Sequence, residues 1–213
     1  MSFIPAFDIG LWNAWILTLY LALHPLLIRL IAGKKEFERL GNSADMPPSK
    51  TQKGISTFST VIFILLLIYS VFLPLKLGMM WFYIGLPICL LGLTMFTIAI
   101  VSITNVPLDE PFTKGLYRYS RHPMYVTYFL SLIGVGIASA SWIFLLFSII
   151  HTTPSFVHAI REERFCLERY GDAYREYMSR TPRWIGVPKS GKLEGAQPLQ
   201  NLSPSPLKEE ERS

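Results

Sequence analysis

Charged side chains are scarce in this sequence of 213 residues. Asp, Glu, Lys and Arg make up 16% of it, while 51% of the residues are hydrophobic. A soluble domain usually carries about 25% charged residues, so this chain has too few charges to cover a water-soluble globule. The mean hydropathy of +0.35 agrees with that deficit. The composition therefore predicts a membrane protein.

Cysteine is scarce as well, and the two that occur are poorly placed to form a pair. Cys89 lies within an apolar run and Cys166 within a charged segment, so no disulfide framework is predicted. The first apolar run is not preceded by basic residues, and no small-residue cleavage site follows it. We therefore expect no removed signal peptide.

Long apolar runs are plentiful, and three of them are long enough to cross a bilayer, which takes about 20 residues. They cover residues 11–31, 55–75 and 80–103. A fourth run, 124–160, is too long for one span and contains the small residues of 134–141. Glycine there weakens a helix, so we expect a hairpin of helices near 124–138 and 141–160. The sequence predicts an all-α polytopic bundle of about five transmembrane helices.

The positive charges are placed asymmetrically along the predicted spans. In a five-span arrangement, 19 of the 20 Lys and Arg residues fall on one side of the membrane, and only Lys76 falls on the other. The positive-inside rule then predicts an N-terminus outside and a cytoplasmic C-terminus. This placement explains the net charge of +5 without a nucleic-acid partner. We expect a multi-pass protein of a bacterial or archaeal plasma membrane or of the endoplasmic reticulum, with the lipid bilayer as its partner.

Three regions follow from this organisation. Residues 1–104 form a three-span region, and 105–186 contain a polar loop, the hairpin and further helices. Within the latter, 159–186 has an amphipathic pattern, with Gly171 as the break between two helices. Residues 187–213 are polar, contain Pro and Ser and lack aromatic side chains, so we expect them to be disordered. The number of copies in the assembly does not follow from the sequence.

Two adjacent carboxylates stand where the last apolar run ends. Glu162 and Glu163 could be ordinary surface charges balanced by Arg161 and Arg164. They could equally bind hydroxyl or ammonium groups, because cations of the loop 105–123 on the same side would keep them ionised. Ionisable groups at a membrane boundary are functional candidates by default. The residues alone leave both interpretations open.

Histidines give weaker signals. His24 lies inside the first apolar run, and we expect it to be a packing residue. His151, His158 and Glu162 share a helical face but form no convincing ligand cluster, so no metal site is predicted. The loop 105–123 and the segment 159–183 together supply donors, acceptors and aromatic rings on one side. That composition is typical of a polar cofactor meeting a membrane-dissolved substrate, without naming the cofactor.

Two motifs in order resemble a known family. "TKGLYRYSRHPMYV" is followed about 40 residues later by "REERFCLERYGDAYREYMSRTPRWI". Over residues 105–186 this pattern is similar to that of the isoprenylcysteine carboxyl methyltransferase and phospholipid N-methyltransferase superfamily. The resemblance implies an integral-membrane enzyme. It would transfer a methyl group from S-adenosylmethionine to a lipophilic carboxylate, amine or thiol at the cytoplasmic face.

The resemblance also implies a set of site residues. The positions it assigns to the cofactor are Asp109, Glu110, Pro111, Phe112, Gly115, Tyr117, Arg121, His122, Tyr125, Glu162 and Glu163. The later "RTPR" would help to close the site. A carboxylate or thiolate acceptor needs no base, whereas an amine must lose a proton, for which His122, His158 or Glu163 could serve.

Two positions depart from the family pattern. Thr127 stands where a glycine is frequent, and His158 replaces an arginine that binds a prenylcysteine carboxylate. The second departure leaves amines, thiols and other lipids open as acceptors. Membrane sterol and steroid reductases, which use NADPH, have a similar Arg-His-Pro-x-Tyr and acidic pair, but the ending "RTPRWIG" and the small size favour a methyltransferase. A non-catalytic membrane scaffold with the same fold is the third alternative.

Overall fold

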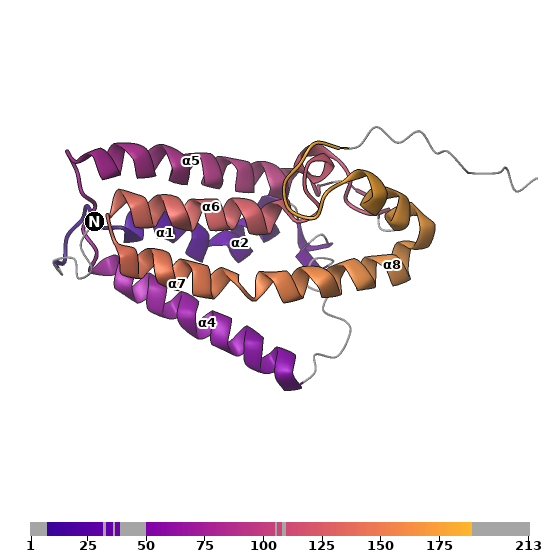
Figure 1. Cartoon of the computed structure of the whole chain (residues 1–213), viewed down its shortest axis with the longest axis horizontal. Coiled ribbons are helices and arrows are strands. Elements are labelled where there is room, and N and C mark those ends of the chain that lie inside the picture. Colours follow the sequence, from indigo (N-terminus) through magenta and orange to yellow (C-terminus); the bar gives the residue numbers. More distant parts are fainter. Residues whose placement is uncertain are drawn as a thin grey trace, which may run out of the picture.

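The computed structural model describes residues 8–31, 33–35, 37–38, 50–104, 106–107 and 110–188. Helices account for the regular structure of these ranges, and the longer ones lie side by side along the long axis of the molecule (Figure 1). In chain order they are α1 (Trp15–Ala22), α2 (His24–Ile31), α4 (Lys50–Val71), α5 (Met80–Val101), the short 3₁₀ helix η1 (Gly115–Arg118), α6 (Pro123–Ala138), α7 (Trp142–Thr152) and α8 (Ser155–Arg180). The prediction of an all-helical bundle is confirmed.

Three helical segments are long and apolar enough to cross a membrane. They are Lys53–Val71, Met80–Val101 and Trp142–Arg180, and the apolar helix Pro123–Ala138 is shorter. The third segment joins α7 to α8, and its charged residues begin at Arg161, so we place the end of its spanning part before that residue. These helices agree with a multi-pass membrane protein, while the sidedness stays a prediction.

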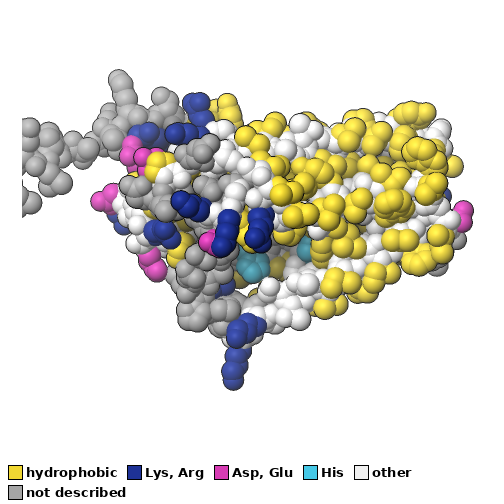
Figure 2. Space-filling model, turned by 180° about the vertical axis from the view of Figure 1, so that it is seen from behind, with side chains coloured by type: hydrophobic (Ala, Val, Ile, Leu, Met, Phe, Trp, Pro, Cys, Tyr) yellow, Lys and Arg dark blue, Asp and Glu magenta, His cyan; other side chains and the backbone are white. Residues whose placement is uncertain are grey.

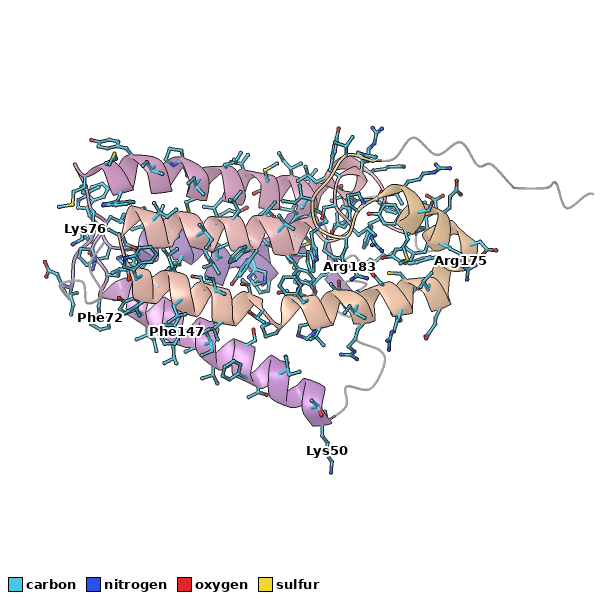
Figure 3. The ribbon with its side chains drawn as sticks, in the orientation of Figure 1. Lys50, Phe72, Lys76, Phe147, Arg175 and Arg183 are labelled. Carbon is cyan, nitrogen blue, oxygen red and sulfur yellow. The ribbon has the colours of Figure 1, made fainter. Side chains whose placement is uncertain are left out.

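The charge asymmetry expected from the sequence has a spatial counterpart. Hydrophobic side chains cover the body of the molecule, and most Lys and Arg side chains gather at one end (Figure 2). Lys76 lies at the opposite end of the bundle from Lys50, Arg175 and Arg183 (Figure 3). The bundle therefore has a basic end and an end where Lys76 lies, as the predicted topology requires.

The first apolar run was expected to be one span over 11–31, and the structure divides it at Leu23 into two helices of eight residues each. Pro25 has no N–H to give to the carbonyl of Leu21 four residues earlier. Instead, His24 Nδ1 lies 2.6 Å from that carbonyl oxygen. The side chain of His24 thus replaces a missing backbone hydrogen bond at the break.

The second apolar run also differs in its bounds from the predicted 55–75. Helix α4 ends at Val71 because the chain after it pairs with the residues that precede α1. The N–H of Ala14 donates to Leu73 O at 2.8 Å, and that of Leu75 donates to Trp12 O at 3.0 Å. These bonds tie the start of α1 to the end of α4.

The predicted hairpin is present. Helices α6 and α7 are joined by a short turn in which Ala140 has φ 51° and the N-cap Ser141 accepts from Phe144 N. The arm predicted over 141–160 consists of α7 and the start of α8, which meet at Thr153 and Pro154. The break expected at Gly171 is confirmed, since that residue has φ 53° and ψ −124° within α8.

Helices α5 and α6 pack closely through small residues. A Cβ at Gly134 would lie 2.3 Å from the backbone N of Cys89, and one at Gly92 would lie 2.6 Å from the backbone N of Ser131. Such small residues let helix backbones approach closely in a membrane. The contact holds α6 against α5, so the residues at the start of α6 are fixed relative to the rest of the bundle.

Candidate active site

A cavity of about 480 Å³ lies where the helices meet the polar loop and α8. One end of it is charged and aromatic, and is lined by Phe112, Tyr117, Arg121, His122, Tyr125 and Glu162. The inner end lies between membrane helices and is lined by His24, Ser59, Phe63, Phe96, Tyr128 and His151. Figure 2 shows histidine side chains in a hollow beside the basic end of the molecule. A single space therefore connects charged groups with an apolar interior.

Glu163 is the centre of a buried ion-pair network behind the charged end. Its side chain is 4% exposed. Arg183 contacts both oxygens, Nε to Oε1 at 2.9 Å and Nη2 to Oε2 at 2.7 Å. Arg121 Nη1 lies 3.0 Å from Oε1 and His122 Nε2 lies 3.2 Å from it. Burial raises the pKa of Glu163, but the bonds from His122 and Arg183 and the charge of Arg121 outweigh it and lower that pKa to about 2.

His122 bridges the two glutamates. Its Nδ1 lies 3.3 Å from Glu162 Oε2 and its Nε2 lies 3.2 Å from Glu163 Oε1. Burial lowers the pKa of His122, but the hydrogen bonds and charges of the two carboxylates raise it by more, so the net direction is upward. The Tyr125 ring stacks on the imidazole at 5.7 Å, and its hydroxyl donates to Glu162. His122 is therefore held in place as a cation between two anions.

Backbone hydrogen bonds connect the loop to the segment after α8. The N–H of Arg121 donates to Pro182 O at 3.0 Å, and that of Gly186 donates to Tyr119 O at 3.1 Å. The Tyr177 hydroxyl donates to Tyr117 O at 2.6 Å. Arg183 lies in this segment beside the helices (Figure 3). We refer to residues 181–186 as the C-terminal clasp, since they hold the loop against α8.

Arg121 has an incompletely satisfied guanidinium. Its side chain is 10% exposed and lines the cavity. Among the residues that the structure describes, Nε and Nη1 have no hydrogen-bond acceptor, although Nη1 lies near Glu163. A buried donor without an acceptor is costly. The arrangement therefore suits an anionic group entering the cavity.

The structure brings together only part of the predicted site. Phe112, Tyr117, Arg121, His122, Tyr125 and Glu162 line the cavity, and Glu163 supports them from behind. Glu110, Pro111, Gly115 and His158 do not line it within the described ranges, and Asp109 lies outside the described residues. Gly115 instead packs on the end of α5, where a Cβ would lie 2.1 Å from Ser102 Oγ. Thr127, the departure from the family pattern, is buried and donates to Pro123 O at 2.8 Å within its own helix.

Other lining residues were not among the predicted ones. Tyr170, Tyr174 and Tyr177 line the cavity from α8, and their Tyr-Gly-x-x-Tyr-x-x-Tyr spacing was the available signal. The inner end was missed entirely, because His24 and His151 stand 127 residues apart in separate apolar runs. In the described part of the chain, no three His, Cys, Asp or Glu side chains are grouped as metal ligands would be.

Comparison with known proteins finds related sequences over part of the chain. Residues 75–173 match the family model described as phospholipid methyltransferase. The Protein-S-isoprenylcysteine O-methyltransferase of Schizosaccharomyces pombe is 31% identical over 74 residues, which are 34% of this chain and 31% of that protein. Methanethiol S-methyltransferase 1 of Bradyrhizobium diazoefficiens is 34% identical over 73 residues, 34% of this chain and 25% of that protein.

The chain thus spans about a third or less of the length of these curated relatives. The family-model match covers α5, the loop, the hairpin and α8 as far as Ala173, and so includes all the predicted residues that line the cavity. The resemblance found in the motifs is confirmed. Residues 75–173 of this chain are thus similar to the phospholipid methyltransferase family.

Proposed function

We propose that the protein is an S-adenosylmethionine-dependent methyltransferase that acts on a lipophilic acceptor at the cytoplasmic face of a membrane. The observation that carries the proposal is the single cavity that joins a charged end to an apolar inner end between helices. A water-soluble methyl donor and a membrane-dissolved acceptor need such a connected space to meet. The family match supports the same reaction class.

The charged end has groups that fit this cofactor. S-adenosylmethionine carries a carboxylate, an ammonium group, ribose hydroxyls and a sulfonium. The unsatisfied donors of Arg121 suit the carboxylate, and the carboxylate of Glu162, 34% exposed, suits the ammonium or the hydroxyls. Tyr117 and Tyr125 add aromatic faces, which attract cations. We assign cofactor binding to these four side chains.

When bound, the cofactor supplies an electrophilic methyl group. The contribution of the chain is to hold, orient and shield the two reactants. Glu163 fixes Arg121 and His122, and His122 in turn fixes Glu162. Positioning of this kind supplies a large part of the rate in a displacement reaction. His122 has both nitrogens engaged by carboxylates, so we assign it to holding the site together rather than to accepting a proton.

The test uses the full-length protein in lipid nanodiscs. We expect saturable binding of methyl-tritiated S-adenosylmethionine and transfer of tritium into a total-membrane lipid extract. Glu162→Gln should weaken cofactor binding about tenfold, which corresponds to ~1.4 kcal/mol, while the variant remains folded at the assay temperature. Glu176→Gln is the matched control, because that glutamate pairs with Arg180 on the exposed side of α8. Saturable binding of NADPH without binding of S-adenosylmethionine would overturn the proposal in favour of a reductase, and binding of neither would indicate a scaffold.

A further inference from the structure

The inner end of the cavity contains polar side chains that the proposed function does not use. His24 of α2, Tyr128 of α6 and His151 of α7 line it. The His24 ring lies edge-on to Tyr128, with centroids 5.8 Å apart, and to Phe96 of α5, with centroids 6.0 Å apart. Rings from two other helices thus hold His24 in a fixed orientation, which is the kind of support a reacting group needs.

The hydrogen bond of His24 determines which ring nitrogen carries the proton. Nδ1 lies 2.6 Å from Leu21 O, and a carbonyl oxygen can only accept, so Nδ1 must donate. In the neutral ring, Nε2 is then the nitrogen with a free lone pair. No hydrogen-bond partner of Nε2 is found among the side chains and backbone that the structure describes. His24 therefore has an available basic nitrogen on a residue that lines the cavity.

His151 is arranged differently. Its Nδ1 lies 3.0 Å from Ser59 O, so that nitrogen carries the proton, and its Nε2 lies 3.3 Å from the Tyr128 hydroxyl. Both nitrogens are engaged within the protein. Phe63 stacks on the ring with centroids 5.2 Å apart. His151 thus supports Tyr128, and the available base at the inner end is His24.

The described residues that line the inner end also include no fixed cation. Of the described lining residues, the cationic ones are Arg121 and His122, both at the charged end beside Glu162 and Glu163. A carboxylate acceptor placed beside His24 would be a buried anion without a partner, which is costly. A thiol or an uncharged amine enters such a site at lower cost, and its proton can be donated to Nε2.

We propose that His24 is a catalytic base, and that the acceptor is a thiol or amine on an apolar chain rather than a carboxylate. The inference rests on the proposed function, which supplies the methyl sulfonium donor. The acceptor S–H or N–H donates its proton to His24 Nε2 as the acceptor atom forms its bond to the methyl carbon. The bond from that carbon to the donor sulfur breaks, and its electron pair stays on sulfur as a neutral thioether. The positive charge passes from the sulfonium to the imidazolium.

The variant His24→Asn tests this role. The Asn amide can still donate to Leu21 O, so the break between α1 and α2 is kept, while Nε2 is removed. With dodecanethiol or dodecylamine as acceptor, we expect kcat to fall about 100-fold, the usual lower range for loss of a general base. KM for the acceptor and Kd for S-adenosylmethionine should change less than twofold. Whichever of the two acceptors is methylated identifies the reacting atom.

A second readout does not depend on activity. The chain has four histidines, so nitrogen-15 spectra of histidine-labelled protein in nanodiscs can be assigned by single substitutions. We expect His24 in the Nδ1–H tautomer, and a change in its Nε2 resonance when dodecanethiol or dodecylamine is added without cofactor. Dodecanoate, of the same chain length, should not cause that change.

The outcomes separate the inference from the proposed function. A wild-type protein that binds no S-adenosylmethionine overturns the proposed function. If wild-type protein transfers methyl groups but His24→Asn does so at the same rate, or dodecanoate is the preferred acceptor, the inference about His24 is overturned while the proposed function stands. The variant His158→Asn, at the competing base predicted from the sequence, is the third protein to be compared. A 100-fold loss there, with none at His24, would also overturn the inference.

Discussion

Replacing Glu163 by Gln removes the negative charge from the most buried ion-pair network of the site while nearly preserving the side-chain shape. The amide can still accept one hydrogen bond from Arg183, whose side chain is 39% exposed and can regain water. Arg121 cannot, because it is 10% exposed. The variant therefore leaves a buried guanidinium without a counter-charge, and we expect a clear loss of stability.

Two routes give a similar size for that loss. The fall of the Glu163 pKa from its ordinary 4.5 to about 2 corresponds to about 3 kcal/mol, at 1.36 kcal/mol for each pKa step of one. Removal of one partner from a buried ion pair typically costs about 3–5 kcal/mol. We therefore expect Glu163→Gln to lower the free energy of unfolding at pH 7 by about 3 kcal/mol. Reversible unfolding in mixed SDS and detergent micelles, followed by far-UV circular dichroism, measures this value.

The dependence on pH gives the sharper test. Because the folded-state pKa of Glu163 is depressed, its contribution is present above the unfolded value of 4.5 and is lost as the pH falls toward 2. The difference in free energy of unfolding between wild type and Glu163→Gln should therefore decrease as the pH falls through that range. His122 acts with the opposite sign, because its pKa is raised above 6.5. Its contribution is complete below pH 6.5 and is lost as the pH rises through its folded-state pKa.

The control for this experiment is Glu176→Gln on the same helix. Glu176 and its partner Arg180 are 45% and 43% exposed, and exposed pairs contribute less than about 1 kcal/mol. A difference between wild type and Glu163→Gln that stays constant from pH 7 to pH 3 would refute the electrostatic explanation. So would a loss no larger than that of the control.

Two other substitutions test the packing and the loop. Gly134→Val should prevent α5 and α6 from packing, because its Cβ would lie 2.3 Å from Cys89 N. We expect a sharp fall in the yield of folded protein on size-exclusion chromatography. An unchanged yield would contradict the close contact. Gly54→Ala is its control, since nothing lies within 4 Å of a Cβ there, and helix propensity should raise stability by about 0.5–1 kcal/mol. Tyr177→Phe removes the hydroxyl that donates to Tyr117 O and leaves a buried carbonyl unsatisfied. We expect the free energy of unfolding to fall by about 1–3 kcal/mol. A fall below about 0.5 kcal/mol would show that the bond contributes little to stability.

The sequence predicted those features that depend on local pattern. The hairpin and the break at Gly171 follow from small residues and glycine in otherwise helical runs, and both are present. The break at Leu23 did not follow, because a proline within an apolar run is compatible with a continuous membrane helix. Only the bond from His24 to Leu21 O shows how the structure satisfies the freed carbonyl.

The charged end of the cavity was predictable because its residues lie within two motifs. The motifs did not predict that Arg183 pairs with Glu163, because Arg183 lies 20 residues later and reaches it only through the bend at Gly171 and the turn after α8. The inner end was beyond sequence reasoning for another reason. Its polar residues come from separate helices, and packing of α5 on α6 decides which of them meet. A lone histidine in an apolar run gives no sign of its neighbours.

The C-terminal clasp has a consequence for biosynthesis. Arg183 and Pro182, which secure Glu163 and the loop, follow the last apolar segment in the chain. A nascent polypeptide that has been translated only as far as Arg175 already contains Glu162, Glu163 and Arg121, but not the cation that contacts both oxygens of Glu163. The ion-pair network of Glu163 is therefore incomplete until Arg183 has been translated. Completion of the pocket therefore waits for Arg183, which follows Arg180, the last residue of α8, in the clasp.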